Sequence, residues 1–217
     1  SDIIIADNKV IQDYVLSEYG KKAALIAYGA DHTCKEALSI AVLNQFPFLS
    51  EKYAFKVCRI EPENNVHLIL EAFSEYPLLN IVMVGNWNNS AYGKQLKLQF
   101  DFFKNIYLLE PIYNQNILNQ LRSNCYLYIH GHSAGGTNPS LVEAMYLELP
   151  IIAYDVNYNR ETTNNKARYF KNKIDLTNHL KSLNKKEISS IGLEMKNIAN
   201  DNYTWNLISE KYSKLFF

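Results

Sequence analysis

Residues 130–145 read HGHSAGGTNPSLVEAM, a stretch in which an apolar strand gives way to a glycine-rich loop and then to a helix. Asn138 is a good residue to cap a helix, and Pro139 fits the first helical position. A helix that begins there presents the unpaired N–H groups of residues 140–142 at its N-terminus. Such an end binds anions, phosphate above all. The stretch therefore predicts an anion-binding helix end.

The loop before this helix contains two adjacent glycines, Gly135 and Gly136. Without a Cβ atom, each lets a ligand approach the backbone closely. In an open α/β sheet such a loop lies at the carboxyl end of a strand, where ligands bind. The alternative is that the glycines only make a tight turn. The coincidence of cap, glycines and strand end favours the ligand site.

Outward from this stretch, short apolar runs alternate with amphipathic segments along most of the chain. Strands are predicted over residues 3–6, 23–27, 53–58, 81–84, 106–109, 127–130 and 151–154. Helical segments lie between them, and residues 66–75 carry the stripe of an amphipathic helix. This alternation predicts an α/β fold with a Rossmann-like parallel sheet and helices on both faces. Helices over residues 175–183, 186–199 and 204–217 are expected to form a C-terminal helical cap.

The chain is expected to divide near residue 31. Residues 1–31 form a strand-helix-strand piece that ends in a turn at residues 28–31 and is too small to bury a core alone. We interpret this piece as the tail of a larger N-terminal domain together with a linker. Residues 32–217 are interpreted as the main domain.

Composition excludes several classes of protein. The chain has 217 residues, of which 47% are hydrophobic, and its 22 Lys and Arg balance its 22 Asp and Glu. This balance argues against a strongly basic nucleic-acid-binding protein. Three well-separated cysteines without a CxxC pair argue against a zinc site or a disulfide framework. No signal peptide and no bilayer-length apolar run are visible, so a cytoplasmic location is expected.

Three further side chains are candidates for ligand binding. Glu143 is a carboxylate in an otherwise apolar helix, suited to accept hydrogen bonds from sugar hydroxyls, usually those of ribose; the alternative is a solvated glutamate. Arg59 follows a strand, where its guanidinium can pair with phosphate oxygens, and a surface salt bridge to Glu61 or Glu63 is the alternative. His132 is placed to donate to a ligand, although a loop histidine with its own hydrogen bonds is the commoner outcome.

Residues 131–135 also spell GHSAG, which matches the G-x-S-x-G elbow of serine α/β-hydrolases. Ser133 would be the nucleophile, and Asp155 and His179 follow in the required order. The elbow needs a helix that begins directly after the serine, whereas here the helix starts several residues later. The hydrolase is therefore the least favoured alternative.

Two stretches resemble a known family. Residues 59–65 (RIEPENN) and 135–145 (GGTNPSLVEAM) resemble the C-terminal, donor-binding half of retaining glycosyltransferases of family 4, which have the GT-B fold. More narrowly, they resemble the rhamnosyltransferase-like branch used in bacterial surface polysaccharide synthesis. The match covers nearly the whole chain. The turn at residues 28–31 is similar to the family's interdomain linker, and residues 203–205 are similar to the start of its final segment, which crosses back to the N-terminal domain.

The resemblance implies a donor site. Arg59 would neutralise the diphosphate and is the catalytic candidate, and Glu143 matches the second glutamate of the family's E-x7-E motif, which holds the ribose. The implied donor-binding residues are Gly135, Gly136, Thr137, Asn138, Pro139, Ser140, Leu141, Glu143 and His132. Two departures stand out: Gly135 replaces the first glutamate of the motif, and Asn64 replaces a lysine that usually follows the arginine.

The function implied by the resemblance is transfer of a sugar, rhamnose in this branch, from a nucleotide-diphosphate sugar to a polysaccharide or glycolipid acceptor with retention. The expectation includes no cofactor, no metal and no nucleic acid. The glycan or lipid-linked acceptor would bind through an absent N-terminal domain, so the 217-residue chain alone would be inactive. The full-length enzyme could associate peripherally with a membrane. The alternative is a non-catalytic module that binds a nucleotide sugar.

Overall fold

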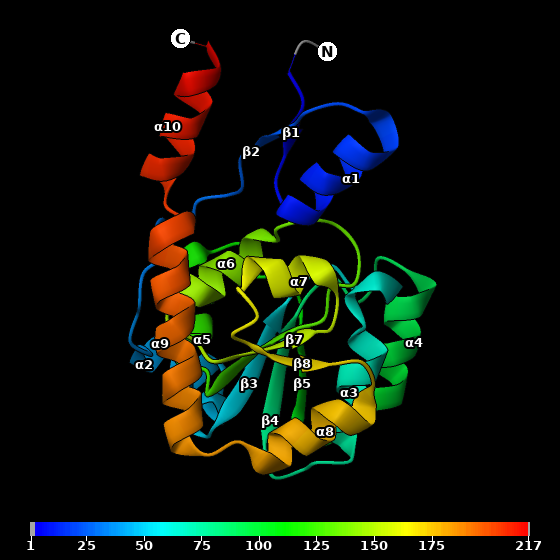
Figure 1. Ribbon diagram of the computed structural model, residues 1–217. Coiled ribbons are helices and arrows are strands. Elements are labelled where there is room, and N and C mark those ends of the chain that lie inside the picture. The colour runs from blue at the N-terminus through cyan, green and yellow to red at the C-terminus, as the bar shows by residue number, and fades with distance from the viewer. Residues whose placement is uncertain (1–2, 217) are drawn as a thin grey trace.

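A six-stranded parallel sheet forms the centre of the computed structural model, which describes residues 3–216 (Figure 1). Its strand order is β5-β4-β3-β6-β7-β8, and every neighbouring pair is parallel. The strands are β3 (Tyr53–Val57), β4 (Asn80–Val84), β5 (Ile106–Leu109), β6 (Leu127–His130), β7 (Ile151–Tyr154) and β8 (Arg168–Phe170). The predicted parallel sheet is therefore confirmed.

Helices cover both faces of this sheet, as the sequence predicts. One core cluster joins one face to helices α2 (Ile40–Gln45), α5 (Gln115–Ser123), α6 (Pro139–Tyr146) and α9 (Lys185–Asn202). The other cluster joins the opposite face to α3 (Val66–Ser74), α4 (Ala91–Phe100) and α8 (Lys173–Ser182). Neighbouring residues of one strand divide between the two clusters: Phe55 belongs to the first and Ala54 to the second. Because successive side chains of a strand point to opposite faces of the sheet, each strand contributes apolar side chains to both core clusters.

A smaller unit lies beyond the carboxyl ends of the main strands (Figure 1). Strands β1 (Ile5–Ala6) and β2 (Ala24–Leu25) pair in parallel, with α1 (Lys9–Tyr19) between them. The final helix, α10 (Trp205–Phe216), stands on the same side of the molecule. Asn8 caps α1, and its amide also donates to Glu161 of α7 (Asn157–Thr162) at 2.7 Å. The small unit is thus joined to the main domain by polar contacts.

The sequence analysis missed strand β8. This strand has only three residues, begins with an exposed arginine and exists because it pairs with β7. The predicted C-terminal helices are present, and α8 begins two residues earlier than expected because the Asn172 side chain caps it. Two short 3₁₀ helices, at Pro47–Ser50 and Pro62–Asn64, complete the fold.

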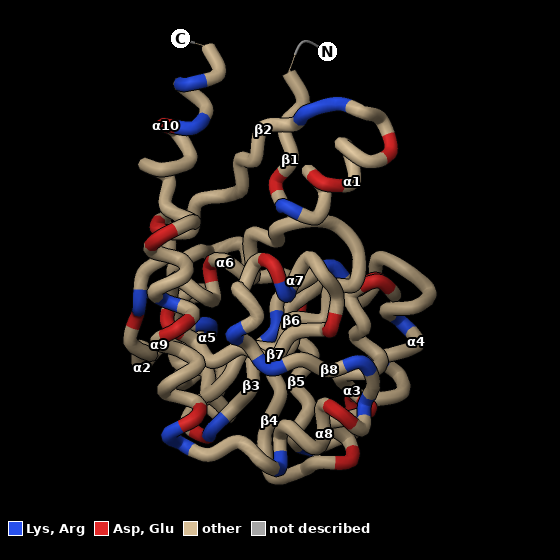
Figure 2. The backbone as a smooth tube through the Cα atoms, in the orientation of Figure 1, with Lys and Arg blue, Asp and Glu red and all other residues tan. Residues whose placement is uncertain are grey.

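Acidic and basic residues are mixed over the molecule, and the view in Figure 2 shows no region of a single sign. Across residues 3–216, no helix is both long and apolar enough to cross a membrane. All three cysteines, Cys34, Cys58 and Cys125, are free thiols.

Candidate functional site

A pocket of about 570 Å³ lies at the carboxyl ends of β3 and β6. It is lined by Tyr28, Val57, Cys58, Arg59, Gln115, Leu118, Arg122, His132, residues 134–140 and Glu143. The structure therefore brings the predicted site residues to one place, with the exception of Leu141, whose side chain is buried in the core. The position agrees with the rule that ligands of open α/β sheets bind at the carboxyl ends of strands.

A second hollow, of about 600 Å³, runs over the exposed face of α4 and is lined by Lys94, Leu98 and Phe102 among others. None of the predicted site residues lines it. It lies beside one helix rather than at the carboxyl ends of several strands, where ligands of open α/β sheets bind.

The helix after the glycine loop begins at Pro139, as predicted, but its N–H groups are not free. The Asn138 side chain accepts a hydrogen bond from the Ser140 N–H at 3.0 Å, and the Asn138 carbonyl accepts those of Leu141 and Val142. The prediction of three unpaired helical donors is therefore wrong, because the cap residue itself satisfies them. The loop before this helix, residues 134–138, also lines the pocket.

The two glycines have different structural roles. Gly135 has φ +108°, a conformation that favours glycine, and a Cβ atom there would meet nothing within 4 Å. A Cβ on Gly136 would instead collide with the carboxylate of Asp7. The Thr137 hydroxyl also donates to the Asp7 carbonyl at 2.6 Å, and burial raises the pKa of the Asp7 carboxyl. Gly135 is thus open toward the pocket, whereas the space beside Gly136 is filled by the N-terminal unit.

Two side chains from distant parts of the chain contact the Glu143 carboxylate. Arg122 Nη1 lies 2.5 Å from Glu143 Oε2, and His32 Nε2 lies 3.0 Å from Oε1. The Arg122 side chain is only 3% exposed, so this is a nearly buried ion pair at the pocket wall. The solvated alternative for Glu143 is therefore wrong. Arg122 itself reads in the sequence as an ordinary arginine in the last turn of a helix, so the sequence analysis missed it.

Arg59 is exposed at the end of β3 and lines the pocket. Within residues 3–216 its guanidinium forms no salt bridge, so the predicted alternative of a pair with Glu61 or Glu63 is not realised. Its backbone carbonyl accepts a hydrogen bond from the Asn64 side chain at 2.7 Å, which holds the turn after the strand. Arg59 is therefore an unpaired cation at the edge of the pocket.

The family described as "Glycosyl transferases group 1" matches residues 44–197, well over half of the chain. The chain belongs to this family. No curated protein matches it. The predicted glycosyltransferase resemblance is thus confirmed at the level of the family, while its narrower branch is not shown.

Solved structures share the fold of this group 1 glycosyltransferase domain. Sucrose-phosphate synthase from Thermosynechococcus elongatus superposes with a TM-score of 0.82 at 13% identity, covering 100% of this chain and 58% of that one. HepE from Anabaena, in complex with UDP and glucose, superposes with a TM-score of 0.83 at 15% identity. The match covers 100% of this chain and 63% of HepE. S. aureus TarM, in a complex that includes UDP, superposes with a TM-score of 0.77 at 15% identity. The match covers 99% of this chain and 44% of TarM. The chain spans about half the length of these proteins, and it has the architecture of one half of a GT-B fold.

Two histidines lie under the glycosyltransferase pocket. The His130 and His132 rings stack with centroids 4.5 Å apart, and neither His130 nitrogen has a partner among the described residues. Burial lowers the pKa of His132 to about 3, helped by the charges of Lys56 and Arg59, and burial lowers the pKa of His130 strongly as well. Both rings are therefore neutral near pH 7. Over residues 3–216, no three His, Cys, Asp or Glu side chains gather as they would around a metal ion.

The first prediction concerns these histidines. In the unfolded chain each imidazole takes up a proton below about pH 6.5, whereas the folded protein keeps both neutral, so acid should reduce the free energy of unfolding. His130→Phe removes one of the two imidazoles that take up a proton on unfolding. Between about pH 7.5 and pH 5, the variant should therefore lose about 2 kcal/mol less of its free energy of unfolding than the wild type. Urea denaturation at the two pH values measures the difference. An equal loss in wild type and variant would contradict the assigned neutral state.

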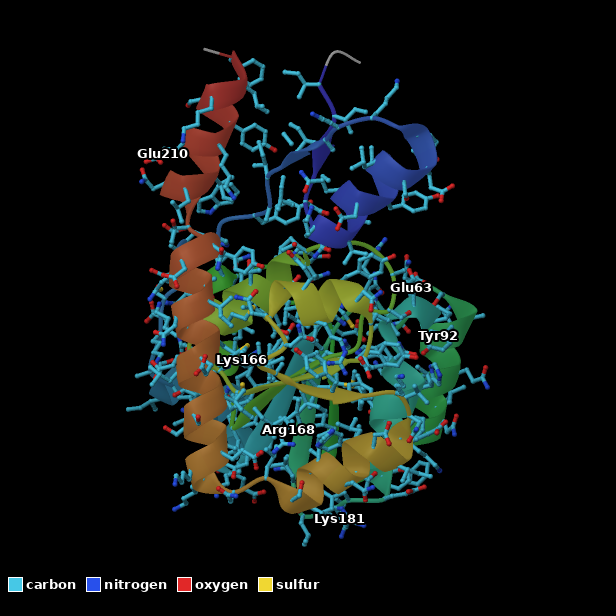
Figure 3. The ribbon with its side chains drawn as sticks, viewed as in Figure 1. Glu63, Tyr92, Lys166, Arg168, Lys181 and Glu210 are labelled. Atoms are coloured by element: carbon cyan, nitrogen blue, oxygen red, sulfur yellow. The ribbon has the colours of Figure 1, made fainter. Side chains whose placement is uncertain are left out.

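The serine-hydrolase alternative is wrong. The Ser133 hydroxyl donates to the Glu63 carbonyl at 2.9 Å, beside the upper end of α3 where Figure 3 labels Glu63. Asp155 pairs with Arg160 at 2.5 Å, and His179 Nε2 lies 2.8 Å from the Tyr169 carbonyl. Each member of the expected triad therefore has a different partner, and no nucleophile–base–acid chain forms.

A smaller hollow of about 370 Å³ continues the pocket along the carboxyl ends of β4 and β5. The two share Val57, Cys58 and Arg59, and the smaller one adds Asn86, Ile112 and Tyr113 among others. Arg59 therefore lines both hollows. The sequence analysis did not predict this extension, because loops after different strands meet only in the folded sheet.

Proposed function

We propose that this chain is the donor-binding half of a retaining glycosyltransferase that uses a nucleotide-diphosphate sugar. The observation that carries the proposal is the pocket in which an unpaired Arg59, the backbone of the glycine loop and the Glu143 carboxylate meet. Membership of the group 1 family supports it. So do the neighbours HepE and TarM, which were solved in complexes that contain UDP.

The chemistry of the site fits a diphosphate leaving group. Negative charge builds up on the diphosphate as the bond to the sugar breaks, and Arg59 can pair with its oxygens in a bidentate way. The positive end of the α6 dipole acts on the same group, and preorganised dipoles of this kind stabilise developing charge efficiently. In this proposal the protein supplies the countercharge, so we expect transfer to need no metal ion or cofactor.

We further propose that the sugar is rhamnose, that the acceptor is a polysaccharide or glycolipid, and that the anomeric configuration is retained. The support is the resemblance of residues 59–65 and 135–145 to the rhamnosyltransferase-like branch. In the proposed enzyme an N-terminal half holds the acceptor in the cytoplasm, with peripheral association at the membrane.

A non-catalytic nucleotide-sugar binding module is the second candidate. Its support is the span of the chain, which covers 58% of sucrose-phosphate synthase and 44% of TarM. Both candidates predict nucleotide binding and differ in whether transfer appears when an N-terminal half is supplied.

The second prediction tests the diphosphate site. Calorimetry should show tighter binding of UDP or dTDP than of the corresponding monophosphate, because the second phosphate reaches Arg59. Arg59→Ala should weaken diphosphate binding by about 10- to 100-fold, which is the worth of hydrogen bonds to a charged group. Arg168→Ala is the matched control, since Arg168 begins β8, pairs with Glu187 and is not among the residues that line the pocket; Figure 3 labels it. Equal affinities for diphosphate and monophosphate would refute the site.

A further inference from the structure

A line of hydrogen bonds connects α10 to the wall of the donor pocket. The indole Nε1–H of Trp205 donates to His32 Nδ1 at 3.0 Å. His32 Nε2 lies 3.0 Å from Glu143 Oε1, and Arg122 holds the other carboxylate oxygen. The final helix is thus two side chains away from a residue that lines the pocket.

The chemistry of Trp205 determines the tautomer of His32. An indole nitrogen can only donate, so His32 Nδ1 must accept. The proton of the neutral ring then sits on Nε2 and is donated to Glu143. Both bonds run in the same direction, from Trp205 through the imidazole to the carboxylate.

His32 belongs to one of two connections between the main domain and the smaller unit, which lie side by side in Figure 1. Residues 29–33 form the first connection, and residues 203–205, between α9 and α10, form the second. The Ala30 N–H donates to the Tyr203 carbonyl at 2.7 Å, and the Trp205 N–H donates to the Asp31 carboxylate at 2.7 Å. A Cβ atom on Gly29 would lie 2.5 Å from the Trp205 ring, so that ring packs directly on the backbone. The two paired connections are therefore joined by two hydrogen bonds and by the packing of the Trp205 ring on Gly29.

Two of the roughly four lone-pair positions of the Glu143 carboxylate are occupied by His32 and Arg122. The remaining positions are available to hydroxyl groups of a ligand in the pocket. Arg122 is part of a nearly buried pair and is anchored on α5, whereas the His32 side chain is about half exposed on a connection. The orientation of the carboxylate therefore depends on where the paired connections sit.

We propose that His32 is a positioning residue that couples occupancy of the donor pocket to the paired connections. This inference rests on the proposed function, because the ligand hydroxyls are those of the donor nucleotide. His32 holds Glu143 in the orientation that receives them. By reciprocity, a bound nucleotide stabilises the contact between His32 and Glu143 and, through Trp205, the start of α10.

Tryptophan quenching together with calorimetry tests the coupling in the whole chain. Trp87 is fully buried and Trp205 is 46% exposed, so acrylamide quenching of the emission reports on Trp205. Saturating UDP, with dTDP as a second probe, should reduce quenching in the wild type. His32→Ala should weaken nucleotide binding about five-fold, at the lower end of usual coupling between sites, and should abolish the change in quenching.

Two matched variants separate positioning from a merely structural role. His32→Gln keeps a donor near the position of Nε2, so nucleotide affinity should stay near the wild-type value. Trp205→Phe keeps an aromatic ring near Gly29 but loses the Nε1–H together with the second ring of the indole, so its affinity should fall between those of wild type and His32→Ala. Equal affinities for wild type, His32→Ala and Trp205→Phe would overturn the coupling.

The outcomes distinguish this inference from the function on which it rests. Absence of binding heat with UDP and dTDP in the wild type would overturn the proposed function and the coupling with it. Normal binding with unchanged Trp205 quenching would overturn the coupling alone. Weaker binding in His32→Ala that His32→Gln does not restore would also count against it, since the role assigned to His32 is that of a donor.

Discussion

Sugar transfer by the 217-residue chain alone should be at least about 10⁵-fold slower than transfer by the same chain joined to an N-terminal, acceptor-binding half. The proposed site binds the leaving diphosphate but does not position an acceptor. Holding the two reactants in the right geometry supplies about 7 to 11 kcal/mol of a barrier, and that contribution would be missing.

The smaller unit provides the structural support for this expectation. Ile5 and Tyr14 on the N-terminal strand-helix-strand piece and Tyr212 on α10 are at least 40% exposed, which is unusual for such large apolar side chains on adjacent elements. In Figure 1 α10 and the β1–α1–β2 piece project together beyond the main domain. We propose that an N-terminal half packs on them and closes the cleft over the pocket.

The assay mixes donor and acceptor with the chain alone, and then with the chain fused to an N-terminal half taken from a homologous group 1 enzyme. Nucleotide binding by calorimetry is the control, because it should be the same with and without the added half. Transfer by the chain alone at a rate near that of the fusion would show that the acceptor site is already present. Binding without transfer in the fusion would favour the non-catalytic module.

Arg122→Ala should reduce the free energy of unfolding by about 3 kcal/mol, the cost of breaking a buried ion pair by removing one partner. Arg122 is 3% exposed and its partner Glu143 is 17% exposed, so the abandoned carboxylate would stay largely shielded from water. Urea denaturation near pH 7 measures the loss. Nucleotide binding should weaken as well, because Glu143 would lose the group that orients Oε2.

The control is Arg160→Ala, which breaks a pair of the same length with Asp155 on a more exposed arginine. That loss should be below about 1 kcal/mol, as for other surface pairs. In the double variant Arg122→Met with Glu143→Gln, most of the stability should return, because no buried charge is left unpaired. A loss in Arg122→Ala no larger than in Arg160→Ala would show that water replaces the guanidinium at the pocket wall.

Most elements of the main domain could be predicted because their signals are local. The predicted strands 106–109, 127–130 and 151–154 coincide with β5, β6 and β7, since apolar runs bounded by polar residues carry the signal of buried parallel strands. The start of α6 was correct because Asn138 and Pro139 specify a helix end by their own geometry. Strand β8 could not be predicted, because three residues carry no usable period and their assignment depends on a neighbour.

In the candidate site too, the residue types were predictable from the sequence, whereas their partners were not. The residue types at Arg59, Gly135 and Glu143 predicted a site for phosphate and sugar hydroxyl groups, because cation, glycine and carboxylate each have a definite chemistry; the nucleotide sugar followed only from the family resemblance. Folding decided which groups surround them: His32 lies 111 residues from Glu143 in sequence, and Arg122 lies 21 residues away on another helix. Asp7 fills the space beside Gly136, and Asn138 takes the N–H groups that seemed free. Such partners depend on the packing of whole elements and on burial, so no local pattern of residues contains them.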